Sequence, residues 1–103
     1  MNTCKICNNE FSDASFNREY EICLPCSMIL ESKVKAMQDA ISQYQEKANA
    51  TSDPDKKILC FKCMLDYLYE YKVCYYDNEV DVLEQDVDDL IDSVIDCIAD
   101  ARV

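Results

Sequence analysis

Two pairs of cysteines are the residues in this sequence best suited to chemistry. Cys4 and Cys7 form the first pair, Cys23 and Cys26 form the second, and fifteen residues separate the pairs. Two Cys-x2-Cys turns at this separation supply four thiolates for a tetrahedral zinc ion. Because a four-thiolate shell leaves no open position for water, the spacing predicts one structural zinc site rather than a catalytic or redox centre.

Four further cysteines occur in the second half of the chain. Cys60 and Cys63 are three residues apart, so both would lie on one face of a helix. A helical hairpin turning near residue 78 would bring Cys97 beside Cys60 and leave Cys74 about 20 Å away along the helix axis. These distances allow a second zinc site at Cys60, Cys63 and Cys97. The favoured alternative is that they are small buried residues, as free cysteines commonly are.

Two residue types are missing altogether, namely histidine and glycine. Without histidine, the chain lacks the commonest general base near neutral pH. Without glycine, phosphate-binding and dinucleotide-binding loops are excluded. We therefore expect that the protein is not an enzyme. The remaining catalytic hypothesis is a thiol nucleophile among the four C-terminal cysteines, activated by a lysine or by a helix terminus.

The first residues lack the charged-then-apolar pattern of a secretory signal, and no stretch is apolar enough to span a bilayer. In a reducing compartment, paired cysteines are more often metal ligands than disulfides. The expectation is a cytoplasmic protein that makes no membrane contact.

The expected fold is mainly α and has two parts, residues 1–50 and residues 51–103. The first part is a treble-clef-like zinc finger with a β-hairpin over residues 11–22, turning at residues 12–15 and running into a helix over about 25–48. Zinc suits this part because about 45 residues cannot build a sufficient apolar core. The second part is an antiparallel hairpin of helices over about 54–76 and 79–101. Turns without glycine are expected to use Asn8, Asn9, Asn49 and Asn78.

Apolar residues recur every three or four positions in the outer two helices. Such narrow seams are typical either of packing within the chain or of a homodimer. The middle helix is apolar nearly all round, so it should be covered on more than one side, with its tyrosines in an interhelical core. The predicted seams are Leu30, Val34, Met37, Ile41, Tyr44 and Ala48, and then Val80, Leu83, Val87, Leu90, Val94, Cys97 and Ala101.

Charge is distributed unevenly along the chain, whose net charge is −11. Between Asp77 and Asp100 there are ten acidic residues and no basic one. Such a field repels nucleic acid and favours a protein partner with a basic surface, although a solvated outer face is an equally open interpretation. The candidate partner-binding residues are Asp81, Glu84, Asp88 and Asp92.

Two functions of other classes compete with that interpretation. One is a nucleic-acid-binding zinc finger that uses a local group of bases while the acidic helix faces away. The other is a structural module for oligomerisation or for linking other proteins. The bases of the first alternative are Lys5, Arg18, Lys33 and Lys35.

The segment Cys4-Lys5-Ile6-Cys7, fifteen residues and then Ile22-Cys23-Leu24-Pro25-Cys26 resembles the zinc motif of the Gin-type anti-sigma factors of spore-forming bacteria. The resemblance covers about residues 4–31. It implies that the four cysteines bind zinc and that the protein inhibits a sigma factor by direct contact. A small zinc-binding inhibitor of the transcription or DNA-processing machinery, with an acidic or nucleic-acid-mimicking surface, is accordingly the predicted function.

Overall fold

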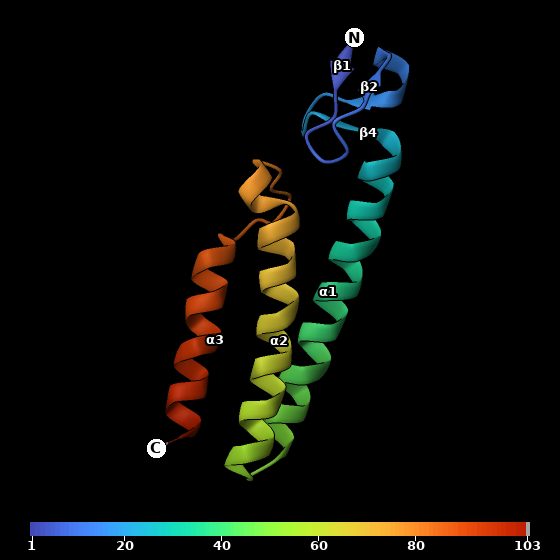
Figure 1. Cartoon of the computed structure of the whole chain (residues 1–103). Helices are drawn as coiled ribbons and strands as arrows, with labels where there is room; N and C mark the ends of the chain where they lie inside the picture. The colour runs from blue at the N-terminus through green and yellow to red at the C-terminus, as the bar shows by residue number, and fades with distance from the viewer. Residues whose placement is uncertain (103) are drawn as a thin grey trace.

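Three α-helices make up most of the computed structural model, which describes residues 1–102 (Figure 1). They are α1 (Leu24–Ala50), α2 (Pro54–Cys74) and α3 (Val87–Ala101). α1 leads away from the N-terminal end, α2 returns beside it, and α3 runs back along α2. The molecule measures 54 × 19 × 19 Å. The mainly α fold, with a long helix followed by a helical hairpin, is therefore confirmed.

Four two-residue strands form two separate ladders at the N-terminal end. β1 (Asn2–Thr3) pairs antiparallel with β2 (Glu10–Phe11), and β3 (Phe16–Asn17) pairs antiparallel with β4 (Ile22–Cys23). The predicted β-hairpin is present, but it consists of β3 and β4 and turns at residues 18–21, so its predicted bounds of 11–22 with a turn at 12–15 are wrong. Its expected turn is instead a short 3-10 helix, η1 (Asp13–Ser15), that joins the two ladders. The first ladder closes around Cys4 and Cys7, whereas the second closes at residues 18–21 and leads into Cys23.

α1 begins directly after the second ladder and continues without a break for 27 residues. Pro25 occupies its first turn, where a missing N–H costs nothing. The predicted seam is its inner face, on which Leu30, Met37 and Ala48 are buried. The helix ends at Ala50, two residues later than predicted, so Asn49 is helical and does not form a turn.

α2 lies between the other two helices and packs against both. It starts where Asp53 accepts a hydrogen bond from the N–H of Asp55, with Pro54 at the first position. Met64, Leu68 and Tyr71 are buried, as an interhelical core requires. Tyr69 is the exception among the tyrosines of this helix, since 45% of its surface is exposed.

α3 starts eight residues later than predicted, and residues 79–86 form an irregular connection instead of its first two turns. Val80 is completely buried there, and the Tyr71 hydroxyl donates to Asp81 at 2.7 Å and accepts the Val82 N–H at 2.9 Å. These contacts hold residues 79–86 in a non-helical conformation. Burial, followed by the bond to Asp81, raises the pKa of Tyr71, so the phenol stays protonated and keeps donating.

The inward face of α3 also differs from the predicted seam. Val87, Ile91, Val94 and Ile98 are buried, whereas Cys97 is exposed. On this helix, two neighbouring faces both carry apolar residues at steps of three or four, so periodicity alone does not choose between them. The position of α2 determines that the face with Ile91 and Ile98 is buried. The expectation that Cys97 points into the hairpin is wrong.

The small N-terminal unit and the helices share one apolar core. Buried residues from the finger, the connection and all three helices form a single cluster. The Lys5 ammonium group reinforces the junction, because it lies 2.6 Å from a Glu21 carboxylate oxygen and 3.6 Å from one of Glu79. Within residues 1–102, no helix combines the length and the apolar character needed to cross a membrane.

The start of α3 can be tested through its cap. Asp86 accepts a hydrogen bond from the Asp88 N–H, so Asp86→Ala should lower the free energy of unfolding by about 0.5–2 kcal/mol. Asp92→Ala, on the exposed side of the same helix, should change it by less than about 0.5 kcal/mol. Urea unfolding followed by circular dichroism measures both. Equal values for the two variants would contradict a helix that begins at residue 87.

Candidate metal centre

Cys4, Cys7, Cys23 and Cys26 converge at the N-terminal end of the molecule. Their four sulfur atoms all lie within 4.8 Å of one another, and the Cys7 and Cys23 sulfurs are 3.9 Å apart. Thiolates about 2.3 Å from a tetrahedral zinc ion are about 3.8 Å from one another. The four cysteines therefore could hold one metal ion such as zinc, with no ligand from another part of the chain.

Each pair orients its first sulfur in the same way. The Cys4 sulfur accepts the backbone N–H groups of Ile6 at 3.4 Å and Cys7 at 3.5 Å, and the Cys23 sulfur accepts that of Cys26 at 3.4 Å. Asn8 follows the first pair with a φ of 61°, which is the left-handed backbone expected of an asparagine here. These donors are aimed at sulfurs that carry negative charge when they bind a metal.

Cys23 has two structural roles. It ends β4, and its side chain also caps α1 by accepting the Cys26 N–H. Cys26 itself lies in the first turn, where the helix dipole stabilises a thiolate. The second cysteine pair is consequently part of the start of the helix rather than of a loop placed near it.

The Cys4 thiol differs strongly in acidity from those of Cys23 and Cys26. Burial alone would raise the pKa of Cys4, but the backbone N–H groups of Cys7, Cys23 and Ile6 outweigh it and lower that pKa to about 6. Burial raises the pKa of Cys23, and burial together with the neighbouring thiols raises that of Cys26. One negative charge is readily accommodated here, and further thiolates need a cation among them.

The second group of cysteines is not brought together in this way. Among the described residues, only the first four supply three or more ligand atoms within such a distance. Cys63 lies beside Tyr44 of α1, since the nearby Cys63 thiol raises the pKa of that tyrosine, with smaller effects from burial and from Tyr67. Cys97 instead lines a groove between α1 and α3. Cys63 and Cys97 therefore have different surroundings, and no second cluster forms among the described residues.

The four acids predicted to bind a partner are differently placed. Glu84 and Asp92 are exposed and form no ion pair among residues 1–102. Asp81 accepts the Tyr71 hydroxyl and the Leu83 N–H, and Asp88 pairs with Lys72. Two of the four thus have intramolecular partners, and their role toward another protein stays a prediction.

Three of the four bases proposed for nucleic-acid binding are paired with acids. Lys5 contacts Glu21 and Glu79, as described above. The Arg18 guanidinium lies 2.8 Å from Asp13, and the Lys33 ammonium lies 3.7 Å from Glu70. Their charge is offset locally, which weakens the attraction of this end of the molecule for phosphates.

The residues missed by sequence reasoning are Glu21 and Glu79, which both have left-handed backbone, with φ values of 56° and 63°. Their carboxylates hold Lys5 from two sides. The sequence does not indicate these two positions, because glutamate is not typical of left-handed backbone.

Comparison with family models, with curated proteins and with solved structures found no match.

Metal content can be tested by removing single thiols. Cys4→Ser should lower zinc affinity by more than the roughly 10–100-fold that loss of an outer-shell partner costs, because it removes a ligand itself. Cys74→Ser, outside the cluster, should leave one zinc per chain. Native mass spectrometry counts the metal, and competition with a chromophoric chelator measures the affinity. Retention of zinc by Cys4→Ser would contradict the site.

Proton release provides a second test. Without metal, the raised pKa values keep Cys23 and Cys26 protonated at pH 7, whereas a bound metal needs both as thiolates. Zinc binding should therefore expel at least their two protons, and the apparent affinity should rise with pH. Titration calorimetry in buffers of different ionisation enthalpy measures the release. Binding heats that are equal in all buffers would show that no proton is lost.

Proposed function

We propose that the chain is a zinc-binding regulatory protein that binds a basic surface of another protein and inhibits it. The observation that carries the proposal is the run of ten acids without a base between Asp77 and Asp100. A field of one sign attracts an oppositely charged surface and repels nucleic acid. The metal cluster supports a structural role for zinc, because four thiolates suit that ion and leave no position for a substrate.

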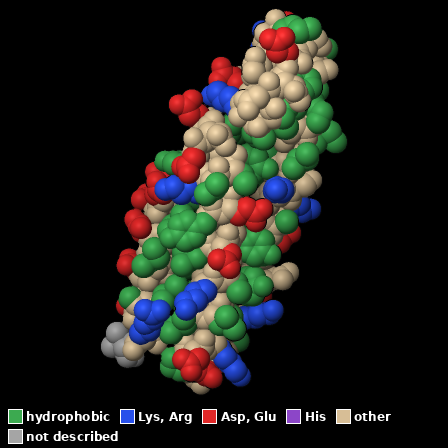
Figure 2. Space-filling model, in the orientation of Figure 1, with side chains coloured by type: hydrophobic (Ala, Val, Ile, Leu, Met, Phe, Trp, Pro, Cys, Tyr) green, Lys and Arg blue, Asp and Glu red, His purple; other side chains and the backbone are tan. Residues whose placement is uncertain are grey.

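The placement of the acids on α3 favours an interaction surface. Asp89, Asp92, Asp96 and Asp100 are exposed, and none forms an ion pair among residues 1–102. Their spacing of three or four residues puts them on one face of the helix. Figure 2 shows acidic side chains along the edge of the molecule that α3 forms. Glu84 extends this surface beyond the helix start.

The class of target follows from the charge of the surface. Proteins of the transcription and DNA-processing machinery carry basic surfaces that bind phosphate groups. An acidic helix that occupies such a surface excludes the nucleic acid, and this is how inhibition would arise. The resemblance of the cysteine motif to Gin-type anti-sigma factors points to the same class of target. No catalytic step is part of this function.

The proposal is tested by neutralising the exposed face of α3. A variant with Asp89, Asp92, Asp96 and Asp100 changed to Asn should capture the partner from host lysate at least about tenfold less well, because four exposed charge pairs are lost. The matched control changes four exposed acids elsewhere, Glu10, Glu19 and Glu46 to Gln and Asp39 to Asn, and should bind normally. Quantitative mass spectrometry of the captured protein gives the readout.

Two further outcomes bear on the same proposal. Capture should weaken steeply between about 0.1 M and 1 M salt, since screening is much stronger at the higher concentration. The purified partner should also lose binding to its nucleic acid when the wild-type chain is added. Equal loss of capture in both neutralised variants, or capture that is insensitive to salt, would contradict recognition by α3.

A further inference from the structure

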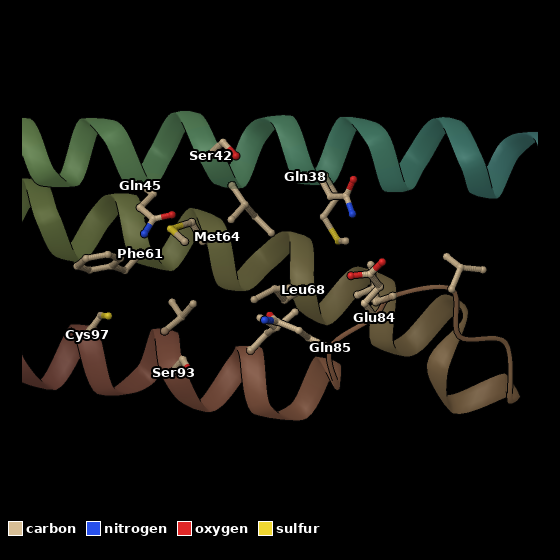
Figure 3. A pocket seen from close by; sticks show the side chains of 16 residues that line it. Gln38, Ser42, Gln45, Phe61, Met64, Leu68, Glu84, Gln85, Ser93 and Cys97 are labelled. Atoms are coloured by element: carbon tan, nitrogen blue, oxygen red, sulfur yellow. The ribbon is translucent and has the colours of Figure 1, made fainter.

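A groove of about 630 Å³ opens between α1 and α3 over one side of α2. Figure 3 shows Phe61, Met64 and Leu68 of α2 at its floor, between the two outer helices. Apolar side chains also line its walls, from α1 on one side and from α3 on the other. These wall residues are Met37, Ile41, Leu90 and Val94.

The two rims of the groove differ in charge. On the α1 side, Gln38, Ser42 and Gln45 are polar and uncharged. On the α3 side, Glu84 lines the groove, and Asp89 and Asp96 each directly precede a lining residue. Both aspartates are exposed. The exposed charges beside the α1 wall are of both signs, Lys35, Asp39, Glu46 and Lys47, so net negative charge borders the groove on the α3 side only.

The length of the groove limits what can lie in it. Its α1 wall runs from Met37 to Gln45, which is nine residues or about 12 Å of helix. This length is close to the distance from position i to position i+7 of a second helix. Recognition of a helix in a groove uses such i, i+4 and i+7 side chains as apolar anchors.

We propose that this groove binds one amphipathic helix of a partner protein, with apolar anchors at i, i+4 and i+7 and with Lys or Arg only on the flank that faces α3. The inference rests on the proposed function, since it names the part of the basic partner that the acidic helix recognises. A basic flank complements Glu84, Asp89 and Asp96, while the anchors contact the half-buried side chains of Ile41, Phe61 and Leu90. The α1 rim, where exposed acids and bases balance, has no such preference for a basic residue.

A second copy of this chain is a poorer occupant. Each copy carries a net charge of −11, so a second chain on the acidic rim would meet like charge. A partner helix with the basic residues on one flank avoids this repulsion. The charge of the rim therefore selects a partner protein over self-association.

A synthetic helix provides a direct probe. The peptide is built from Ala, Leu and Lys, about 16 residues long so that it is helix-competent. It carries a fluorescein label, Leu at i, i+4 and i+7, and Lys on one flank. Its twin has Glu in place of every Lys. Fluorescence anisotropy against the zinc-loaded full chain should show binding of the Lys peptide and at least about tenfold weaker binding of the Glu twin.

Two serines of α1 give a matched pair of protein variants. Ser32 and Ser42 are both exposed on this helix, but only Ser42 lines the groove. Ser42→Arg puts bulk and positive charge into the groove and should weaken binding of the Lys peptide at least about tenfold. Ser32→Arg makes the identical change outside the groove and should stay within about twofold, as exposed substitutions normally do.

Other results would overturn the inference. Equal effects of the two serine variants would place the peptide elsewhere on the molecule, and equal affinity for the Lys peptide and its Glu twin would remove the charge selection. A wild-type dimer in sedimentation velocity that Ser42→Arg dissociates would assign the groove to a second copy. These results differ from those that would contradict the proposed function. If partner capture depends on the exposed acids of α3 but not on Ser42, the proposed function is supported and the groove is not the binding site.

Discussion

The structure depends first on the convergence of four sulfur atoms at one point. The strands around them are only two residues long, and ladders of that length cannot hold a fold alone. Burial of Cys4 and Ile22 adds an apolar contribution, but a unit of this size normally needs a metal or disulfides. A bound cation would balance thiolates that otherwise oppose one another. It would thereby stabilise both ladders and the first turn of α1 at once.

The packing of the helices depends on a second constraint, which is that most of the surface of α2 must be covered. This helix is apolar on most of its circumference, and α1 and α3 cover two sides of it. Three helices arranged in this way leave a groove between the outer two. The acidic residues gather on α3 and on the connection before it, so one chain presents an apolar groove with net negative charge along one rim. The candidate metal centre and the acidic surface of α3 occupy different parts of an elongated molecule.

Sequence reasoning succeeded where the signal is local. Cys-x2-Cys spacing identifies four cysteines that converge and could hold a metal, because both members of each pair lie on one turn. Asp53 with Pro54 marks the start of α2 for a similar reason. The start of α3 was missed because Val80 continues the period of Val87. The burial of Val80 and the hydrogen bonds of the Tyr71 hydroxyl, ten and eleven residues away, hold the connection outside a helix. The exposure of Cys97 was missed because periodicity alone does not say where the neighbouring helix lies.

The double role of Cys23 has a consequence for how the length of this chain can vary. A cysteine that is both a candidate ligand and a helix cap sets the rotational phase of all 27 residues of α1. One residue inserted between Cys26 and Leu30 would rotate the rest of the helix by about 100° and turn Ile41 away from the core. Related chains should therefore gain or lose residues in the turn before Ile22 or in the link before Pro54. The first turns of α1 should keep a constant length.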